Sequence, residues 1–120
     1  MMITATEVAR RLKTQPQSVL ALIQSNILPS KQIGRRRRMW EPSLCAALKR
    51  FHSGPGFMPS TVFPDDFLTL EEAAGVMRIS KQTVLRWIHR KSIPSYRFSE
   101  RIMRVRDAEL RSNMGEVKGE

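Results

Sequence analysis

One passage of 27 residues occurs twice in the chain, and this repeat limits the possible folds more than any other feature. Residues 4–30 and 69–95 align at a shift of 65 without a gap, and nine of the 27 aligned positions are identical. The identical pairs are Thr4/Thr69, Glu7/Glu72, Ala9/Ala74, Gln17/Gln82, Val19/Val84, Leu20/Leu85, Ile23/Ile88, Pro29/Pro94 and Ser30/Ser95. Self-similarity at a fixed spacing indicates that one small supersecondary unit is present in two copies.

The repeat predicts four segments along the 120 residues. The first copy covers residues 1–52, a linker rich in proline, glycine and phenylalanine covers 53–67, and the second copy covers 68–113. Residues 114–120 are expected to form a flexible tail. Because a solvated tether has no use for phenylalanine, the three phenylalanines of the linker predict that it packs partly against one copy.

Local capping signals in the second copy predict a pair of helices. Thr69 and Glu72 form a capping box, in which each side chain accepts a hydrogen bond from the backbone N–H of the other residue, so a helix should cover Leu70–Met77. Ser80 is a favourable N-cap for a second helix over Lys81–Arg90. The apolar stripe of this second helix consists of Val84, Leu85 and Ile88.

The first copy repeats these helix signals. Thr4 and Glu7 again form a capping box, which predicts the start of the first helix. Pro16 stands in the first turn of the second helix, where its missing N–H does no harm. The apolar stripe expected for this second helix consists of Val19, Leu20 and Ile23.

Each helix pair is followed by a segment that alternates like a β-hairpin. The sequence predicts short hairpins within residues 31–40 and 95–106, and a closing helix after each. The closing helices are expected over Pro42–Phe51 and Asp107–Asn113. The predicted fold is therefore mainly α-helical with small β-hairpin wings, a tandem winged helix-turn-helix.

The charge of the chain is large and unevenly distributed. Its 21 basic and 11 acidic residues give a formal net charge of +10, which indicates a polyanionic partner. Residues 1–52 contain ten basic and two acidic side chains, for a charge of +8, whereas the remaining residues contribute +2. The two copies are thus expected to share a scaffold and to differ in charge.

The second helix of the second copy carries side chains suited to reading bases. An α-helix fits the major groove of DNA, where glutamine pairs well with adenine and arginine with guanine. Gln82 and Arg86 lie four residues apart, so they are neighbours on one helix face. The polar face expected to meet DNA consists of Lys81, Gln82, Arg86, His89 and Arg90. The alternative is that this basic face is simply solvated.

The first copy differs at the matching positions. Ala21 replaces Arg86 there, and among the reading positions only Gln17 keeps the side chain of its counterpart. Its charge lies in the hairpin, where an arginine run suits a phosphate ridge or a narrow minor groove. The run consists of Arg35, Arg36, Arg37 and Arg38. A solubility patch or a localisation signal is the alternative for this run. The hypothesis is a division of labour, with base reading by the second copy and backbone affinity from the first.

No catalysis, metal site or cofactor is expected. Cys45, His52 and His89 are the only cysteine and histidine residues, and their spacing does not match that of metal ligands. Cys45 falls on the apolar face of its helix and is expected to be buried. Trp40 and Trp87 are interpreted as core residues, with stacking on bases as the alternative.

Neither a secretion signal nor a membrane span is visible in the sequence. No apolar run approaches the ~20 residues that a membrane helix needs, and the N-terminal residues lack a basic start followed by an apolar stretch. The single cysteine excludes an intramolecular disulfide. A cytoplasmic, nucleoid-associated protein is therefore expected.

Residues 68–110 also carry a set of motifs that occur together in a known family. The segment begins with the motif Leu-Thr-x-x-Glu-Ala-Ala, and its second helix contains Ser-x-x-Thr-Val-x-Arg-Trp-Ile. The dipeptide Ile-Pro precedes the hairpin, and the motif Arg-Val-Arg-Asp-x-x-Leu follows at the end of the hairpin. It resembles the excisionase-like, MerR-related winged helix-turn-helix family. This resemblance implies that the recognition-helix residues meet the major groove, that Trp87 packs inside, and that the wing meets the minor groove or the backbone. The residues concerned are Gln82 and Arg86 on the helix, and Arg101 and Arg104 in the wing. Thr83, next to Gln82, is also predicted to contact DNA.

The function expected from these observations is sequence-specific binding of double-stranded DNA. The resemblance suggests a mobile-element protein that acts as a transcription regulator or as an excisionase, a recombination directionality factor. Three alternatives stay open: a DNA-recognition subunit of a phage packaging complex, a basic RNA- or ribosome-associated protein, and a protein-interaction module that recruits an integrase. The expected partner is duplex DNA. A second expected interaction is with an integrase or recombinase, or with another copy of the chain on the same DNA.

Overall fold

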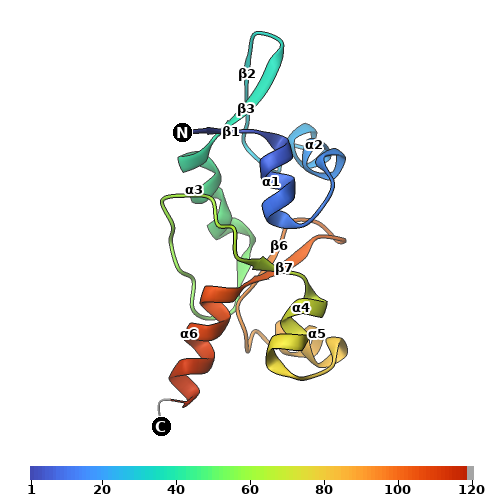
Figure 1. Ribbon diagram of the computed structural model, residues 1–120, viewed down its shortest axis with the longest axis vertical. Coiled ribbons are helices and arrows are strands. Elements are labelled where there is room, and N and C mark those ends of the chain that lie inside the picture. The colour runs from blue at the N-terminus through green and yellow to red at the C-terminus, as the bar shows by residue number, and fades with distance from the viewer. Residues whose placement is uncertain (119–120) are drawn as a thin grey trace. The chain divides into compact units, whose positions relative to one another are not determined.

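The structure is a computed structural model that describes residues 1–118, except for the side chains of Arg36 and of residues 115–118. The described residues form six helices and two small antiparallel sheets (Figure 1). This mixture of helices and sheets is consistent with helix-turn-helix units that carry wings. The chain divides into two compact units: unit 1 contains residues 1–50 and 59–65, and unit 2 contains residues 51–58 and those from Asp66 on.

Unit 1 combines a helix pair, a three-stranded sheet and a closing helix. Helices α1 (Ala5–Leu12) and α2 (Pro16–Gln24) come first, and α3 (Glu41–Phe51) follows the sheet. The antiparallel sheet has the strand order β1-β3-β2. Its strands are β1 (Met2–Ile3), β2 (Lys31–Ile33) and β3 (Arg36–Trp40). The β2–β3 hairpin extends beyond α1 and α2 (Figure 1).

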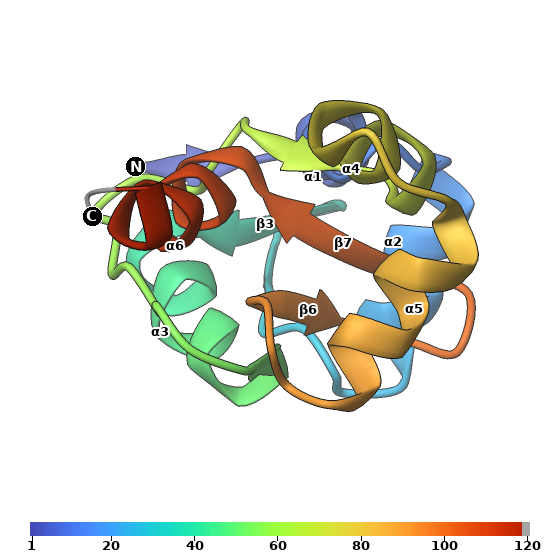
Figure 2. The same ribbon diagram turned by 90° about the horizontal axis from the view of Figure 1, so that it is seen from below.

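Unit 2 has the same order of elements and one more strand. Helices α4 (Leu70–Met77) and α5 (Lys81–His89) precede the hairpin, and α6 (Asp107–Lys118) follows it. The antiparallel sheet has the strand order β4-β6-β7-β5. Its strands are β4 (His52–Ser53), β5 (Phe67–Leu68), β6 (Ser95–Arg97) and β7 (Met103–Arg106). In Figure 2, α4 and α5 lie to one side of the β6–β7 pair, and α6 continues from the end of β7.

The predicted threonine caps start α1 and α4. The Thr69 hydroxyl accepts a hydrogen bond from the N–H of Glu72 at 3.1 Å, and the Glu72 carboxylate accepts one from the N–H of Thr69 at 2.9 Å, which completes the capping box. Thr4 likewise accepts from the N–H of Glu7 at 3.1 Å. The Glu7 carboxylate, however, accepts hydrogen bonds from two arginines, and these lower its pKa to about 2. Those arginines are Arg10 and Arg11.

Both helix pairs also end in the same backbone geometry. Lys13 and Arg78, which are 65 residues apart, end α1 and α4 in the left-handed region, each with φ of 57°. Asn26 and Lys91, again 65 residues apart, have φ of 59° and 58° after α2 and α5. A left-handed residue at a helix C-terminus satisfies carbonyl groups that the helix leaves open. The repeat in the sequence is therefore matched by a repeat in the backbone.

Each unit has a core of its own. The fully buried apolar side chains of unit 1 come from all its main elements and include Val8, Leu12, Val19, Met39 and Leu44. In unit 2, α4, α5 and β7 share a core that includes Ala73, Val84, Val105 and Leu110. Residues on the apolar stripes of the helices thus meet a strand of the hairpin in both units.

The predicted linker is divided between the two units. In unit 1, Phe63 is buried, its N–H donates to the Glu41 carboxylate at 2.7 Å, and its carbonyl accepts from Arg11 at 2.7 Å. In unit 2, residues 51–58 pack with the sheet, and the two-residue strands β4 and β5 form where no regular element was predicted. Such short strands depend on their partner strands, because two residues carry no periodicity that a sequence could reveal.

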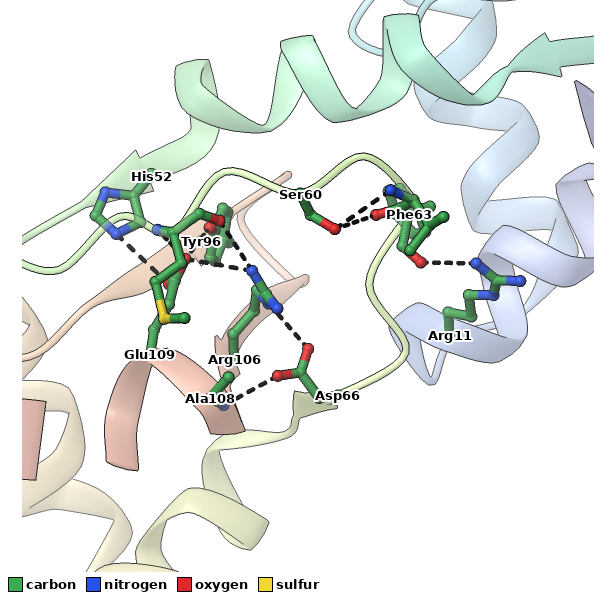
Figure 3. Close-up of polar contacts among 11 residues, drawn as sticks. Arg11, His52, Ser60, Phe63, Asp66, Tyr96, Arg106, Ala108 and Glu109 are labelled. Carbon is green, nitrogen blue, oxygen red and sulfur yellow. Dashed lines mark hydrogen bonds and ion pairs between the residues drawn. The ribbon is translucent and has the colours of Figure 1, made fainter. Parts of the chain in front are cut away.

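A buried carboxylate organises one side of unit 2. Glu109 is fully buried, and its Oε2 accepts from the Tyr96 hydroxyl at 2.6 Å and from the N–H of Met58 at 3.0 Å. Arg106 lies 3.7 Å from the same oxygen, and His52 Nε2 lies 3.6 Å from Oε1 (Figure 3). Burial lowers the pKa of His52 and, with the adjacent carboxylate, raises the pKa of Tyr96. The network ties residues 51–58 to β6, β7 and α6.

Three side chains lie elsewhere than predicted. Leu20 is 41% exposed, because Leu22 takes the inward position on α2. Trp40, interpreted as a core residue, is about half exposed, because Met39 takes the inward position on β3 and successive strand residues face opposite sides. Cys45 is half-buried rather than fully buried.

Helix bounds differ from the prediction mainly at the closing helices. α3 begins at Glu41, one residue before the predicted start, and α5 ends at His89. α6 runs to Lys118, so it enters the segment predicted to be a flexible tail. Its start is fixed by Asp66, whose carboxylate accepts from the N–H of Ala108 at 2.9 Å. The last two residues of the predicted tail, 119–120, lie outside the described part of the chain.

Candidate nucleic-acid interface

Helix α5 presents the predicted reading residues to solvent. The Ser80 hydroxyl accepts from the N–H of Thr83 at 3.1 Å and so starts the helix at Lys81. Val84 and Ile88 are buried against the core of unit 2, which turns the opposite face outward. The exposed residues on and just after α5 include Lys81, Gln82, Arg86, His89 and Arg90, as predicted for a reading face.

Thr83 connects the helix cap to the candidate reading arginine. Its Oγ1 lies 2.9 Å from the Ser80 hydroxyl and accepts a hydrogen bond from Arg86 Nη2 at 3.2 Å. This chain of contacts holds the Arg86 guanidinium toward the N-terminal end of α5. In helix-turn-helix proteins, the N-terminal residues of the recognition helix are the ones that contact base edges. Thr83 therefore positions Arg86 in addition to lying on the predicted DNA-facing helix.

A cleft of about 340 Å³ separates the hairpin of unit 2 from its helix pair. Three of the predicted DNA-binding residues line this cleft: Lys81 from α5, and Arg101 and Arg104 from the hairpin. Glu71 and Glu100 line it as well. The structure thus brings the start of the recognition helix and the two wing arginines to one surface.

Acidic side chains already engage part of this basic surface. Lys81 Nζ lies 2.8 Å from Glu71 Oε2, and this hydrogen bond lowers the pKa of Glu71. Burial lowers the pKa of Arg104, while Glu71 and Glu72 oppose that effect. A DNA phosphate that approached Lys81 would have to compete with Glu71. The sequence offered no signal for this ion pair, because its members lie on different helices and follow no fixed spacing.

The far end of α5 carries the other two predicted contacts. His89 and Arg90 are exposed there, away from the cleft. Trp87 is half-buried and packs against the core of unit 2 without being part of its buried centre, so its interpretation as a core residue is confirmed only in part. Its remaining surface lines a pocket of about 420 Å³, and Arg90 lies at the same pocket.

The equivalent helix of unit 1 offers a different surface. α2 contains no charged residue, and Gln17, Leu20 and Ala21 are exposed on it. Its N-cap, Gln15, makes no side-chain capping bond, and Pro16 occupies the first turn. Glutamine at position 17 is thus available to a base edge, but no arginine accompanies it on this helix.

A tight turn forms the tip of the unit 1 hairpin. Ile33 pairs with Arg36, which leaves Gly34 and Arg35 as the two turn residues. Gly34 has φ of +61°, which suits the first central position of a type II′ turn, where a side chain would be strained. The turn in unit 2 is longer, and a hydrogen bond of 2.9 Å from the N–H of Phe98 to the carbonyl of Ile102 closes it. The two wings therefore differ in length.

The arginine run of unit 1 lies along this hairpin. Arg35 and Arg37 are exposed, and Arg38 is half-buried; the side chain of Arg36 lies outside what the structure describes. Arg37 donates to the Ser30 hydroxyl at 2.9 Å. Lys31 stands directly opposite Arg38 in the β2–β3 pair. Like charges opposite each other destabilise a sheet by roughly 0.2–1 kcal/mol, and a bound polyanion would relieve that repulsion.

A comparison with known families identifies the part of the chain that carries the cleft. Residues 67–116 match the family model described as a helix-turn-helix domain. These residues form a helix-turn-helix domain. The partner typical of such a domain is DNA. The match covers α4, α5, the hairpin and most of α6, and it does not include residues 1–66.

Two further comparisons add nothing about the family of the chain. No curated protein and no solved structure matched the chain. Within residues 1–118, no helix is long and apolar enough to cross a membrane. The helix-turn-helix domain is thus the feature that connects this chain to known proteins.

Proposed function

We propose that the protein binds a specific sequence of double-stranded DNA, with α5 in the major groove and the two hairpins on the backbone or in the minor groove. The observation that carries this proposal is the outward face of α5, the second helix of the helix-turn-helix domain, where Gln82 and Arg86 stand about one helical turn apart. Arginine and glutamine are the side chains best suited to reading guanine and adenine.

Within this proposal the two units have different tasks. Unit 2 reads bases through Gln82 and Arg86, with Arg101 and Arg104 beside the helix. Unit 1 adds affinity for the phosphate backbone through the arginines of its hairpin, because α2 has no charge of its own. Since both units belong to one chain, the second contact is intramolecular and strengthens binding by roughly 10²–10⁴-fold if both units engage together.

The biological role that we propose is that of a mobile-element protein, either a transcription regulator or an excisionase. It rests on the resemblance of residues 68–110 to the excisionase-like family and on the high positive charge of a short chain. An excision assay distinguishes the roles: the purified protein, added to an integrase and a supercoiled substrate of the same element, should increase excision. An effect on transcription from an adjacent promoter, with excision unchanged, would assign it to regulation.

The DNA-binding proposal itself is tested by selection from a random duplex pool. The full chain should enrich a single motif that contains a G·C pair, and Arg86→Ala should erase the preference at that pair. Enrichment of the same motif by wild type and by Arg86→Ala would refute the assignment of Arg86. Recovery of no motif at all would refute sequence-specific reading.

A further inference from the structure

The hairpin sheets of the two units correspond residue by residue. In unit 1, Met2 pairs with Trp40, and in unit 2, Phe67 pairs with Arg106. The same bond closes both sheets: the N–H of the first residue of the closing helix donates at 2.9 Å to the carbonyl of the residue before β1 in unit 1 and before β5 in unit 2. Along the hairpins, the pair of Lys31 and Arg38 corresponds to the pair of Tyr96 and Arg104. Two residues further along the same side of the strand, Ile33 corresponds to Phe98.

One face of this sheet is covered in unit 2. Its residues Phe67, Tyr96 and Phe98 are all buried. The cover is the segment 51–58, in which the Phe51 ring lies 4.9 Å from Phe98 and the His52 ring 5.1 Å from Tyr96. The same segment adds β4 as a fourth strand, antiparallel to β6. The edge and the face are thus covered by one continuous piece of chain, which begins at the last residue of α3.

The corresponding face of unit 1 is bare. Trp40 is 49% exposed, Ile33 53% and Met2 36%, although their counterparts on unit 2 include core residues. The outer edge of β2 pairs with no strand among residues 1–118, because β2 is the last strand in the order β1-β3-β2. A groove of about 390 Å³ lies on this face, lined by Met2, Lys31, Ile33, Trp40 and Ser43 among others.

The charges on this face indicate what its cover must carry. In unit 2, the buried carboxylate of Glu109 accepts a hydrogen bond from Tyr96. In unit 1, Ser43 stands at the position of Glu109, and Lys31 stands at the position of Tyr96. Lys31 forms no ion pair within the described residues, and Arg38 lies across from it. An occupant that supplied a carboxylate would complete the face.

We propose that an extended acidic segment of a partner protein binds here as a fourth strand. It pairs antiparallel to β2 through its backbone, as β4 does to β6, and main-chain hydrogen bonds at an exposed edge supply the affinity. The residue opposite Lys31 is a glutamate or an aspartate. The residue opposite Ile33, two positions away on the same face, is aromatic or aliphatic and covers Trp40 and Ile33.

The proposal is tested with a defined peptide on the full chain. The probe is a capped peptide with threonine at every second position, and phenylalanine and glutamate in turn at the positions between. In a Trp87→Phe background Trp40 is the remaining tryptophan. Binding of the peptide should shift the fluorescence emission of Trp40 to shorter wavelength. In the wild-type chain, the peptide should also slow amide hydrogen exchange in β2. A peptide with lysine in place of glutamate should do neither.

Matched variants separate this face from general surface effects. Ile33→Glu should weaken peptide binding by about tenfold or more. Val62→Glu introduces the same charge at an equally exposed apolar residue of unit 1 outside the groove, and it should leave binding unchanged. Reversing both charges, with Lys31→Glu and Arg38→Glu, should exchange the preference, so that the lysine peptide binds better.

Three results would overturn the proposal. The first is no emission shift and no protection of β2 at millimolar peptide. The second is protection of β2 that depends on protein concentration without peptide, which would assign the face to a second copy of the chain. The third is a Trp40 emission shift caused by duplex DNA that survives the double change Arg35→Ala and Arg37→Ala and is abolished by Ile33→Glu, which would assign this face, and not only the hairpin tip, to DNA. None of these results would bear on base reading by α5.

Discussion

Helices α2 and α5 occupy the same place in two passages that share sequence, yet they present different chemistry to solvent. α5 displays Gln82 and Arg86 beside further cations, whereas α2 displays Gln17 with apolar and uncharged neighbours. The hairpins show the opposite distribution, since the unit 1 hairpin carries the arginine run. The two units thus share the threonine caps of α1 and α4 and the left-handed residues that end both helix pairs, while their charges lie on different elements. The contrast teaches that backbone geometry and partner chemistry are specified by separate residues.

The sheets differ in a second respect, namely in how they are covered. Unit 2 closes its sheet face with residues 51–58 and with the Glu109 network, whereas the same face of unit 1 is open. A covered face contributes to stability, and an open face is available for binding.

The largest effect is expected from removing the buried carboxylate of unit 2. Glu109→Ala leaves the Tyr96 hydroxyl and the Met58 N–H without their acceptor in a buried site and removes one of the two carboxylates beside Arg106, which should cost about 3–5 kcal/mol of unfolding free energy. Urea unfolding of unit 2, followed through Trp87 fluorescence in a Trp40→Phe background, measures it. The corresponding change in unit 1, Ser43→Ala, is at an exposed position and should cost less than about 0.5 kcal/mol. Equal costs would break the contrast between the two sheets.

Base reading should depend on unit 2. Arg86→Ala should lower discrimination between the selected duplex and a mismatched one by about 1–3 kcal/mol, because a bidentate contact to guanine is lost. Competition binding measured by fluorescence anisotropy gives the value. Gln24→Ala changes an exposed polar residue of α2 and serves as the control. A loss of discrimination from Gln24→Ala as large as that from Arg86→Ala would show that the helices read alike.

Backbone affinity should depend on the unit 1 hairpin. The double change Arg35→Ala and Arg37→Ala should weaken binding to all duplexes alike and reduce the slope of log K against log salt by about two units, because each phosphate contact contributes about 0.9. Titrations at several salt concentrations measure the slope. If the double variant lost sequence preference while its salt slope stayed unchanged, the proposed division between the units would be wrong.

The smallest effect is expected from pH. Burial lowers the pKa of His52 in the folded chain, so the unfolded chain binds more protons as pH falls through the ordinary histidine range. Unit 2 should therefore lose stability as pH falls from about 7.5 toward the lowered folded pKa, since the unperturbed value is about 6.5. Urea unfolding at several pH values should show this loss in the Trp87 signal, and His52→Gln should remove it. His89→Gln, at an exposed histidine, should leave it in place.

The sequence was sufficient for the local elements and insufficient for contacts between distant ones. Thr69 and Ser80 predicted the starts of α4 and α5, because a capping hydrogen bond is made within three residues. Trp40 was placed wrongly, because the inward side of β3 depends on the register with β1 and not on the residue type. The contact between His52 and Glu109 joins residues that no local pattern relates.

The candidate site was predicted in the same uneven way. The exposed face of α5 followed from helical periodicity, and the five residues predicted for that face are all exposed in the structure. The pairing of Lys81 with Glu71 and the open face around Trp40 did not follow, since both arise from tertiary packing. Sequence patterns thus indicated which residues could meet DNA, and the fold shows which of them lie together.

The central claim is that this chain uses two related units to bind duplex DNA, and equilibrium binding to a labelled duplex at low ionic strength tests it most directly. The chain should retain the duplex tightly, and this binding should weaken steeply as salt is raised, with a slope of several units in log K against log salt. A chain that is folded by circular dichroism and shows no retention of double-stranded DNA at low ionic strength would contradict it.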